Sequence, residues 1–372
     1  MNIPLSSPDI TESDIEAVVD VLKTPRLSLG PKLVEFENKM AEYIGVDYAV
    51  AVNSGTSALH LIVRALGIKD GDEVITTPFS FIASANCILF ERAKPVFVDI
   101  DPVTLNMIVS GIEKRITEKT KAILAVDVFG YPAQWDELEQ LAQKHNLLLI
   151  EDSCEALGAQ YKGRKLGTFG EAGAFAFYPN KQMTTGEGGI IVTNNGKIAS
   201  LCRSMRNQGR GEGDEWLQHS RLGYNYRISD INCALGIAQL ERIESIVAKR
   251  EQVACLYDIR LRDMEEIRVP FSSPEMKRSW FVYVVVLADR YSTENRDSIL
   301  KELKERGIGC SNYFTPIHLQ PFYRKMFGFN RGDFPITEHI SERTIALPFY
   351  SNLSEQEIDF VTQSLKEIIA EL

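Results

Sequence analysis

One lysine stands out because of its neighbours. Lys181 follows the aromatic run 175–178 (Phe-Ala-Phe-Tyr) and precedes the glycine-rich stretch 186–189. Most lysines are solvated surface groups. Apolar surroundings disfavour the charged ammonium, so a lysine here would be an amine able to form an imine with a carbonyl compound. A glycine hairpin that carries an ordinary surface lysine fits the same residues.

Two other segments place polar groups where strands are expected to end. Asp152 closes the apolar run 147–152, and α/β sheets bind ligands at the carboxyl ends of parallel strands. A carboxylate there can keep a pyridine nitrogen protonated, or it can simply cap the next helix. The turn 53–56 precedes an expected helix, whose free N–H groups suit an anionic phosphate. Capping by Ser54 or Thr56 explains the same turn.

The elements that must position these residues follow from the apolar pattern. The apolar runs are continuous rather than alternating, which is typical of strands buried on both faces. Helical patterns separate these runs, so we expect a doubly wound α/β domain with a mostly parallel sheet between helices. The expected strands are 48–52, 73–76, 95–100, 121–128, 147–152, 173–178 and 189–193.

A long helical pattern from Ser229 leads out of the sheet region, and we place the domain boundary along it. A large α/β domain, with N-terminal helices, is expected over 1–245, and a smaller α+β domain over 246–372. The smaller domain is expected to contain a strand at 280–287, a helix around 296–306 and a terminal helix capped from about Ser354.

The N-terminal region predicts a helix of its own. Thr11 and Asp14 have the spacing of a capping box, and a helical pattern runs from Thr11 to Lys23. We expect this helix to pack its apolar face on the core. That face consists of Ile15, Val18, Val19 and Leu22.

Composition excludes several classes of protein. The chain has 372 residues, 44% hydrophobic and 25% charged, which suits a globular core. A net charge of −10 without a basic stripe argues against nucleic-acid binding. Six scattered cysteines have no metal-ligand spacing and are expected to be reduced. Because the sequence has neither a secretory signal nor an apolar run of about 18 residues, we expect a cytoplasmic protein that does not bind membranes.

Six motifs occur in order along the chain. They are Asn-Ser-Gly-Thr-Ser-Ala-Leu-His (53–60), Glu-Asp-Ser-Cys-Glu-Ala-Leu-Gly (151–158), Phe-Tyr-Pro-Asn-Lys (177–181), Thr-Thr-Gly-Glu-Gly-Gly (184–189), Arg-Asn-Gln-Gly-Arg (206–210) and Gly-Tyr-Asn-Tyr-Arg (223–227). Together they resemble the DegT/DnrJ/EryC1/StrS family of sugar aminotransferases, which use pyridoxal 5′-phosphate (PLP). The resemblance spans nearly the whole chain and implies the fold type I of PLP-dependent transferases, which is similar to aspartate aminotransferase.

The resemblance implies roles for the residues around the cofactor. Lys181 would form the Schiff base and act as general acid and base, and Asp152 would bind the pyridine nitrogen. The backbone of Gly55 and Thr56 would hold the phosphate. Phe81 would lie over the cofactor ring, although it could equally belong to the core.

The resemblance also implies a second subunit. Asn225 matches a residue that reaches the phosphate from a neighbouring chain, so a homodimer with active sites at the subunit interface is expected. Tyr224 and Arg227 would brace that interface or the sugar nucleotide. Tyr313 and His318 would border the sugar, although a structural histidine bonded to backbone is an equal alternative for His318.

Two positions depart from the family pattern. Ala176 stands where a serine often contacts the phosphate, so one hydrogen bond of about 0.5–1.5 kcal/mol is missing or supplied elsewhere. Glu155 stands where histidine or glutamine often approaches the phenolic oxygen of the cofactor. Because a second ionised carboxylate would oppose a phenolate, Glu155 is protonated, paired with a cation or turned away.

The presence of Lys181 decides between the chemistries of the resembling family. Its dehydratases have histidine in place of the imine lysine, so the sequence predicts transamination. L-Glutamate would donate the amino group to a nucleotide-linked 4-keto-6-deoxy sugar, giving a 4-amino sugar for surface polysaccharide or amino-sugar biosynthesis. The alternatives are a 3-keto sugar aminotransferase, a PLP lyase or desulfurase with Cys310 as its thiol, and a non-catalytic PLP-binding regulatory protein.

Overall fold

A seven-stranded sheet forms the centre of the computed structural model, which describes residues 1–211 and 213–372. The strand order is β1-β9-β8-β5-β4-β2-β3, and only β9 runs antiparallel to its neighbours. The mostly parallel sheet expected from the sequence is therefore confirmed. The strands are β1 (Tyr48–Val52), β2 (Glu73–Thr76), β3 (Lys94–Phe97), β4 (Thr120–Val126), β5 (Leu148–Asp152), β8 (Ala172–Ala176) and β9 (Gly189–Thr193).

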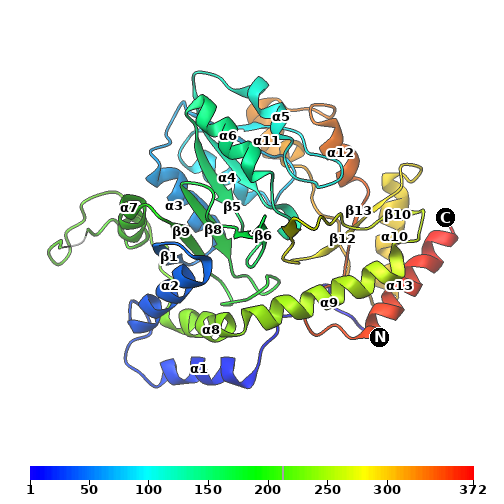
Figure 1. Cartoon of the computed structure of the whole chain (residues 1–372), viewed down its shortest axis with the longest axis horizontal. Helices are drawn as coiled ribbons and strands as arrows, with labels where there is room; N and C mark the ends of the chain where they lie inside the picture. The colour runs from blue at the N-terminus through cyan, green and yellow to red at the C-terminus, as the bar shows by residue number, and fades with distance from the viewer. Residues whose placement is uncertain (212) are drawn as a thin grey trace.

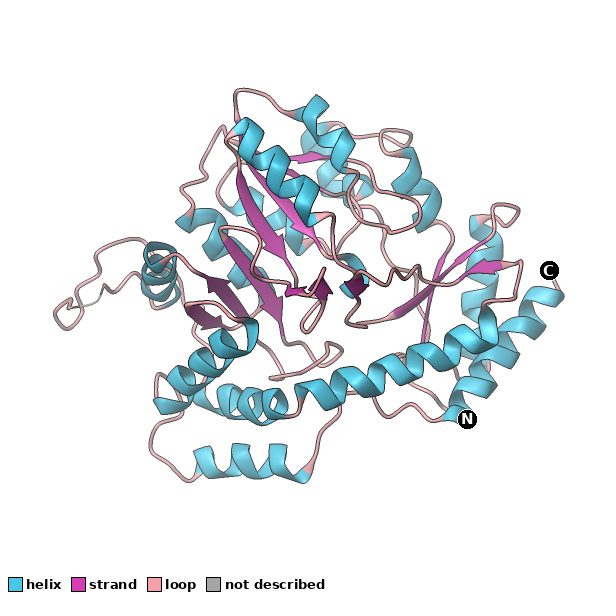
Figure 2. Cartoon of the chain, in the orientation of Figure 1, coloured by secondary structure: helices cyan, strands magenta, loops and turns pink. Residues whose placement is uncertain are grey.

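Helices cover both faces of this sheet (Figure 2). One face packs on α3 (Gly55–Ala65), α4 (Ala83–Phe90) and α7 (Gly196–Arg206). The other packs on α2 (Pro31–Ile44), α6 (Trp135–His145) and α8 (Asp230–Glu241). Because both faces are buried, strand residues of both parities are apolar, which explains the continuous runs in the sequence. Short helical turns complete this part: α5 (Val109–Ile112), η1 (Glu113–Arg115) and η2 (Val128–Gly130).

The long helix α9 (Ile243–Leu261) connects the large sheet to a smaller α+β part (Figure 1). There β10 (Ile267–Arg268), β12 (Tyr283–Leu287) and β13 (Thr344–Leu347) form a sheet. Its core includes α10 (Thr293–Glu305) and α13 (Glu355–Ala370), which begins with the expected capping box. The predicted boundary between residues 245 and 246 falls inside α9 and stays a prediction.

The remaining elements are short. A third sheet joins β11 (Met276–Lys277) to β6 (Gln160–Tyr161) and β7 (Arg164–Lys165). Three helical segments lie between residue 316 and β13: η3 (Ile317–Leu319), α11 (Pro321–Phe327) and α12 (Pro335–Ser341). No helix of the described ranges has the length and apolarity needed to span a bilayer. All six cysteines are free thiols.

Helix α1 (Glu12–Leu22) corrects one expectation. Its predicted apolar face is not in the core, because Ile15 is 48% exposed and Leu22 is 55% exposed. The buried residues of the helix are Asp14 and Val21 instead. Asp14 is fully buried and accepts hydrogen bonds from Thr11 N–H at 2.8 Å and from Arg242 at 2.8 Å. The ion pair sets the rotation of the helix, and Ile15, Val19 and Leu22 consequently face outward.

The backbone of Gly130 lies very close to that of Ser279, where the two parts of the chain pack together. Its φ of +75° suits glycine, and a Cβ there would lie 1.7 Å from the carbonyl oxygen of Ser279. Gly328 has the same conformation, with φ +74° and open space around it. We expect Gly328→Ala to cost about 1–2 kcal/mol of unfolding free energy from the left-handed backbone. Gly130→Ala should cost about 1–3 kcal/mol more, because the methyl group clashes.

Urea unfolding of the two variants measures this difference. If Gly130→Ala is too unstable to fold while Gly328→Ala folds, this also supports the larger loss of unfolding free energy expected for Gly130→Ala. Equal losses in the two variants would show that the backbones of residues 130 and 279 are not in close contact.

Candidate active site

A cavity of about 500 Å³ opens where the carboxyl ends of the parallel strands meet. The starts of α3 and α4, the turn after β5 and the segment after β8 line it, and Phe281 and Phe314 close it from the C-terminal part. The structure thereby brings together residues that are more than 250 positions apart. The predicted site residues that line the cavity are Gly55, Thr56, Phe81, Asp152, Glu155, Lys181 and Tyr313.

The side chain of Lys181 lies inside this cavity. Only 13% of it is exposed, and its Nζ lies 3.8 Å from the centre of the Phe281 ring. The same Nζ is 3.6 Å from Glu155 Oε1. Lys181 is therefore enclosed by an aromatic ring and a carboxylate, and the alternative of a surface lysine on a glycine hairpin does not apply.

Glu155 is the cavity's second titratable partner. Burial raises the pKa of Glu155, while the charge of Lys181 and the N–H of Phe129, which donates to Oε2 at 2.9 Å, oppose the rise. Of the three settings that the sequence left open, the structure shows the one paired with a cation. The two charged groups attract each other across 3.6 Å, which is slightly longer than a hydrogen bond.

Asp152 ends β5 and is held on both carboxylate oxygens. Ser84 donates to Oδ2 at 2.6 Å, and the backbone N–H of Cys154 donates to Oδ1 at 3.3 Å. Ser80 in turn lies 2.7 Å from the hydroxyl of Ser84. The sequence did not single out Ser84, because nothing in a serine at the start of a helix indicates which carboxylate it will meet. These contacts fix the direction in which Asp152 points into the cavity.

The start of α3 forms a second polar wall. Ser54 caps the helix by accepting from the N–H of Ser57 at 3.1 Å, so the capping expected there is present. A Cβ on Gly55 would lie 2.7 Å from the Cβ of Ala176, and one on Gly189 would lie 2.5 Å from the carbonyl of Ser54. Only glycines allow this approach. The first N–H groups of α3 and its positive dipole end consequently face the cavity.

Aromatic residues form the remaining walls. Phe81 is 61% exposed at the rim, whereas Phe79 is fully buried. The core role that the sequence left open for Phe81 therefore belongs to Phe79. Tyr313 lines the cavity and packs against Phe281, with ring centres 6.4 Å apart. Tyr178 and Glu187 also line it and were not predicted.

Three predicted residues lie outside the cavity of their own chain. The ring of Tyr224 stacks on Tyr226 at 4.9 Å, and Arg227 donates to Asn207 at 3.2 Å. Asn225 pairs with Asn207 as an isolated β-bridge. Within one chain, this segment does not contribute to the lining described for the cavity.

Two further candidate residues, His318 and Cys310, are buried and hydrogen-bonded within the protein. His318 is fully buried, and its Nε2 lies 3.0 Å from Glu338 Oε1, so it takes the structural setting, with a carboxylate in place of the expected backbone partner. Burial lowers the pKa of His318. Cys310 donates to the carbonyl of Leu300, and burial raises the pKa of its thiol to about 11. The desulfurase alternative needs a reactive thiolate, so it loses its support.

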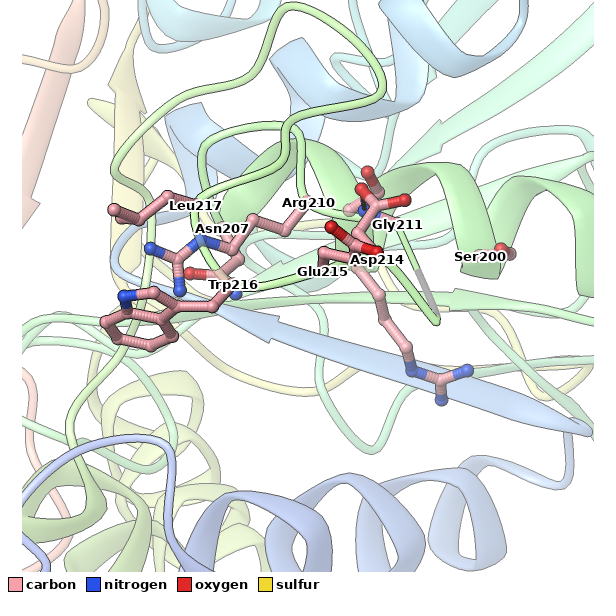
Figure 3. A pocket seen from close by; sticks show the side chains of 10 residues that line it. Ser200, Asn207, Arg210, Gly211, Asp214, Glu215, Trp216 and Leu217 are labelled. Carbon is pink, nitrogen blue, oxygen red and sulfur yellow. Dashed lines mark hydrogen bonds between the residues drawn. The ribbon is translucent and has the colours of Figure 1, made fainter.

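A second hollow, of about 570 Å³, lies at the end of α7 (Figure 3). Arg210 lies over the ring of Trp216, 5.2 Å from its centre, and Asp214 accepts from Ser220 at 2.7 Å. None of the predicted site residues lines this hollow. It is separate from the cavity around Lys181.

Comparison with known proteins identifies the chain. The profile of the DegT/DnrJ/EryC1/StrS aminotransferase family matches residues 8–366. The chain belongs to this family. GDP-perosamine synthase of Escherichia coli O157:H7 is 36% identical to this sugar aminotransferase over 99% of both chains. Helicobacter pylori PseC, an aminotransferase involved in the biosynthesis of pseudoaminic acid, superposes with a TM-score of 0.95, 30% identity and 100% coverage of both chains.

The cofactor of this aminotransferase is PLP. The putative sugar aminotransferase Spr1654 of Streptococcus pneumoniae has PLP and PMP forms, and its PLP form superposes with a TM-score of 0.95 at 30% identity, covering 100% of this chain and 99% of its own. The cavity fits the group. It offers an amine, a carboxylate at a strand end and a helix start cleared of side chains by Gly55 and Gly189.

Ser84 provides a test of this geometry. We expect Ser84→Ala to weaken PLP binding about 3- to 10-fold, because a net hydrogen bond of about 0.5–1.5 kcal/mol no longer orients Asp152. Ser153→Ala is the matched control, since the Ser153 hydroxyl donates to a different buried carboxylate, Asp127, at 2.7 Å. Fluorescence titration of the cofactor-free proteins with PLP measures both affinities. An equal loss in both variants would mean that Ser84 acts only through stability.

Proposed function

We propose that this enzyme transfers the amino group of L-glutamate to C4 of a nucleotide-linked 4-keto-6-deoxy sugar, within surface polysaccharide or amino-sugar biosynthesis. The observation that carries the proposal is the enclosed Lys181 amine, which shares one cavity with Asp152 and the start of α3. A relative named GDP-perosamine synthase, 36% identical, supports a sugar nucleotide as the acceptor. The cytoplasm stays the expected site of the reaction, a prediction that rests on the sequence.

Each group of the cavity has a distinct task in this proposal. PLP supplies a carbonyl carbon and an electron-withdrawing ring. Lys181 holds the cofactor through its amine and moves a proton between carbon centres in both half-reactions. Asp152, oriented by Ser84, keeps a proton on the pyridine nitrogen. The N–H groups of Gly55 and Thr56 bind the phosphate, and Phe81 covers the ring.

Glu155 takes the place of a neutral side chain beside Lys181. A small approach from the observed 3.6 Å would bring the pair into hydrogen-bonding distance, and Glu155 would then receive the proton that Lys181 gives up and return it later. A protonated Glu155 would donate a hydrogen bond to the phenolic oxygen of PLP instead of repelling it. Burial, which raises its pKa, favours this form.

The charge of the cavity supports a second subunit. Among the residues that line it in the described chain, Lys181 is the one cation, whereas Asp152, Glu155 and Glu187 are acidic. Glutamate and a nucleotide diphosphate are anions, and they need cationic partners. We propose that a second copy of the chain supplies them, together with Asn225 at the phosphate. Arg227, close to Asn225 in the chain, is a candidate for the cation.

Exposed apolar side chains supply a surface for this homodimer. The segment after α7 projects from the body of the protein in Figure 1 and carries Trp216, 83% exposed, and Leu222, 67% exposed. Phe81 at the cavity rim and Leu22 on α1 are exposed as well. We propose that the second copy of the chain covers these residues. The higher assembly stays open.

The two alternative functions make different demands. Amination at C3 uses the same groups with a differently seated sugar, and residues at the rim such as Tyr313 would decide between them. A non-catalytic regulatory protein would need the cofactor but no proton-transfer group. The pairing of Lys181 with Glu155 favours catalysis over this alternative.

Lys181→Ala tests the proposed chemistry. We expect wild-type protein with PLP to show a visible absorption band that L-glutamate bleaches, and the variant to lack the band or not to respond. Lys162→Ala, which removes an exposed lysine next to Tyr161, is the control and should behave as wild type. With glutamate labelled with ¹⁵N and a set of keto-sugar nucleotides, NMR of the product locates the amino group.

The outcomes separate the alternatives. Label at C4 supports the proposal, and label at C3 supports the 3-keto alternative. Bleaching by glutamate without turnover of any keto sugar would favour the regulatory protein. A Lys181→Ala variant that still responds like wild type would overturn the assignment of the lysine.

Mixed dimers test whether Asn225 acts across the interface. One dimer pairs a Lys181→Ala chain with an Asn225→Ala chain, and the other pairs a doubly substituted chain with wild type. If Asn225 acts in trans, the first dimer has one intact site and the second has none. We expect the intact lysine site of the second dimer to bind PLP about 3- to 10-fold more weakly, which corresponds to one lost hydrogen bond.

Differently tagged chains isolate the two mixed dimers, and PLP titration measures the affinities. The reverse order of affinities would show that Asn225 serves its own chain. A monomer in sedimentation at micromolar concentration would contradict the homodimer itself.

A further inference from the structure

Arg250 on α9 lies inside the protein, directly behind Lys181. It is 2% exposed, and burial lowers the pKa of its guanidinium to about 10. It therefore stays a cation at neutral pH. Its hydrogen bonds go to backbone carbonyls: Lys181 at 2.8 Å, Phe281 at 3.3 Å and Trp280 at 3.4 Å.

A buried cation whose hydrogen bonds all go to backbone carbonyls is an expensive feature, even with the charge of Asp9 acting on it and the Phe349 ring nearby. Removing a charge from water costs several kcal/mol, and neutral acceptors recover less of it than a carboxylate would. An apolar residue of similar size would serve packing alone as well. The role of Arg250 therefore lies in the backbone segments that its hydrogen bonds hold, rather than in a contribution to the free energy of unfolding.

Two of the three acceptors belong to the surroundings of the Lys181 amine. One is the carbonyl of Lys181 itself, and another is that of Phe281, whose ring centre lies 3.8 Å from Lys181 Nζ. A planar guanidinium with two terminal nitrogens holds both backbones in one fixed arrangement. Gln182 adds a second tie, donating to the carbonyls of Glu155 at 2.6 Å and Ser279 at 3.0 Å.

We propose that Arg250 is a positioning residue for Lys181. Its guanidinium ties the backbone of Lys181 to that of Phe281 and so fixes the amine between the aromatic ring and Glu155. Because α9 joins the two parts of the chain, and Arg250 also lies 5.6 Å from the ring centre of Phe349, the smaller part helps to set the position of the lysine. This inference rests on the proposed function of Lys181.

Arg250→Lys is the variant that tests the proposal. A lysine keeps the charge but offers one nitrogen in place of two, so it cannot hold both carbonyls in the same geometry. Arg296→Lys is the control, because Arg296 is also buried and donates to a backbone carbonyl, that of Ser341 at 3.0 Å. Arg296 also pairs with Asp297 at 2.6 Å and does not line the cavity around Lys181. Thermal unfolding shows how much stability each variant loses.

The glutamate half-reaction should separate the two variants. Misplacing a catalytic group by about 1 Å can cost about 100-fold in rate. We expect the maximal rate of bleaching to fall about 10- to 100-fold in Arg250→Lys, while the half-saturating glutamate concentration changes less than about 3-fold. Arg296→Lys should keep the wild-type rate. An equal fall in both variants would reduce the role of Arg250 to stability.

A double-mutant cycle shows whether Arg250 acts through the lysine. In a Lys181→Ala background, methylamine is supplied as a replacement base. Because no lysine is left to position, we expect Arg250→Lys to change the methylamine-dependent rate less than about 2-fold. The same 10- to 100-fold fall in that background would overturn the proposal. A Lys181→Ala variant as active as wild type would instead refute the proposed function.

Chemical labelling supplies a readout that needs neither PLP nor turnover. Acetic anhydride reacts with neutral amines, and peptide mass spectrometry follows the rate at Lys181 in the cofactor-free protein across pH. We expect the labelling rate or its pH midpoint at Lys181 to change in Arg250→Lys and not in Arg296→Lys. An unchanged profile in both would mean that Arg250 does not set the surroundings of the amine.

Discussion

The site depends on one close approach of backbones. The first residue of β9, Gly189, lies against the start of α3 so tightly that a Cβ would come within 2.5 Å of the Ser54 carbonyl. Gly55 touches Ala176 at the end of β8 in the same way. This contact aims the first turn of α3 at the ends of the parallel strands. The anion-binding helix start and the carboxylate of Asp152 thereby share one small cavity with the Lys181 amine.

The same contact gives a physical account of Ala176. A serine at this position would add a hydroxyl beside Gly55, where a Cβ on the glycine would already lie 2.7 Å from the Cβ of Ala176. With alanine, the proposed phosphate site would rely more on the backbone N–H groups of α3. Because these groups belong to the helix itself, they need no side-chain rotamer to be fixed before binding. In the proposed site, these N–H groups would take over the role of the absent side-chain hydrogen bond.

Patterns of burial were predictable from the sequence, and partners were not. Strands β1, β2 and β9 have the predicted bounds, since continuous apolar runs depend only on both faces being covered. The sequence motifs predicted Lys181 and Asp152 as site residues, and both line the cavity. Ser84 and Phe281 lie far from these residues in the chain, and no local pattern marks a contact that only the fold creates.

Helix α1 shows why an apolar stripe is ambiguous. Periodicity reports that a face avoids water, and it does not say what covers that face. The buried contact of Asp14 with Arg242 decides the rotation of α1 and leaves Ile15 and Leu22 exposed. His318 illustrates the converse case, because a polar residue near a predicted pocket found a buried carboxylate instead. In both places, a charged hydrogen bond outweighs the pattern, since leaving such a group buried and unpaired costs more than exposing a few methyl groups.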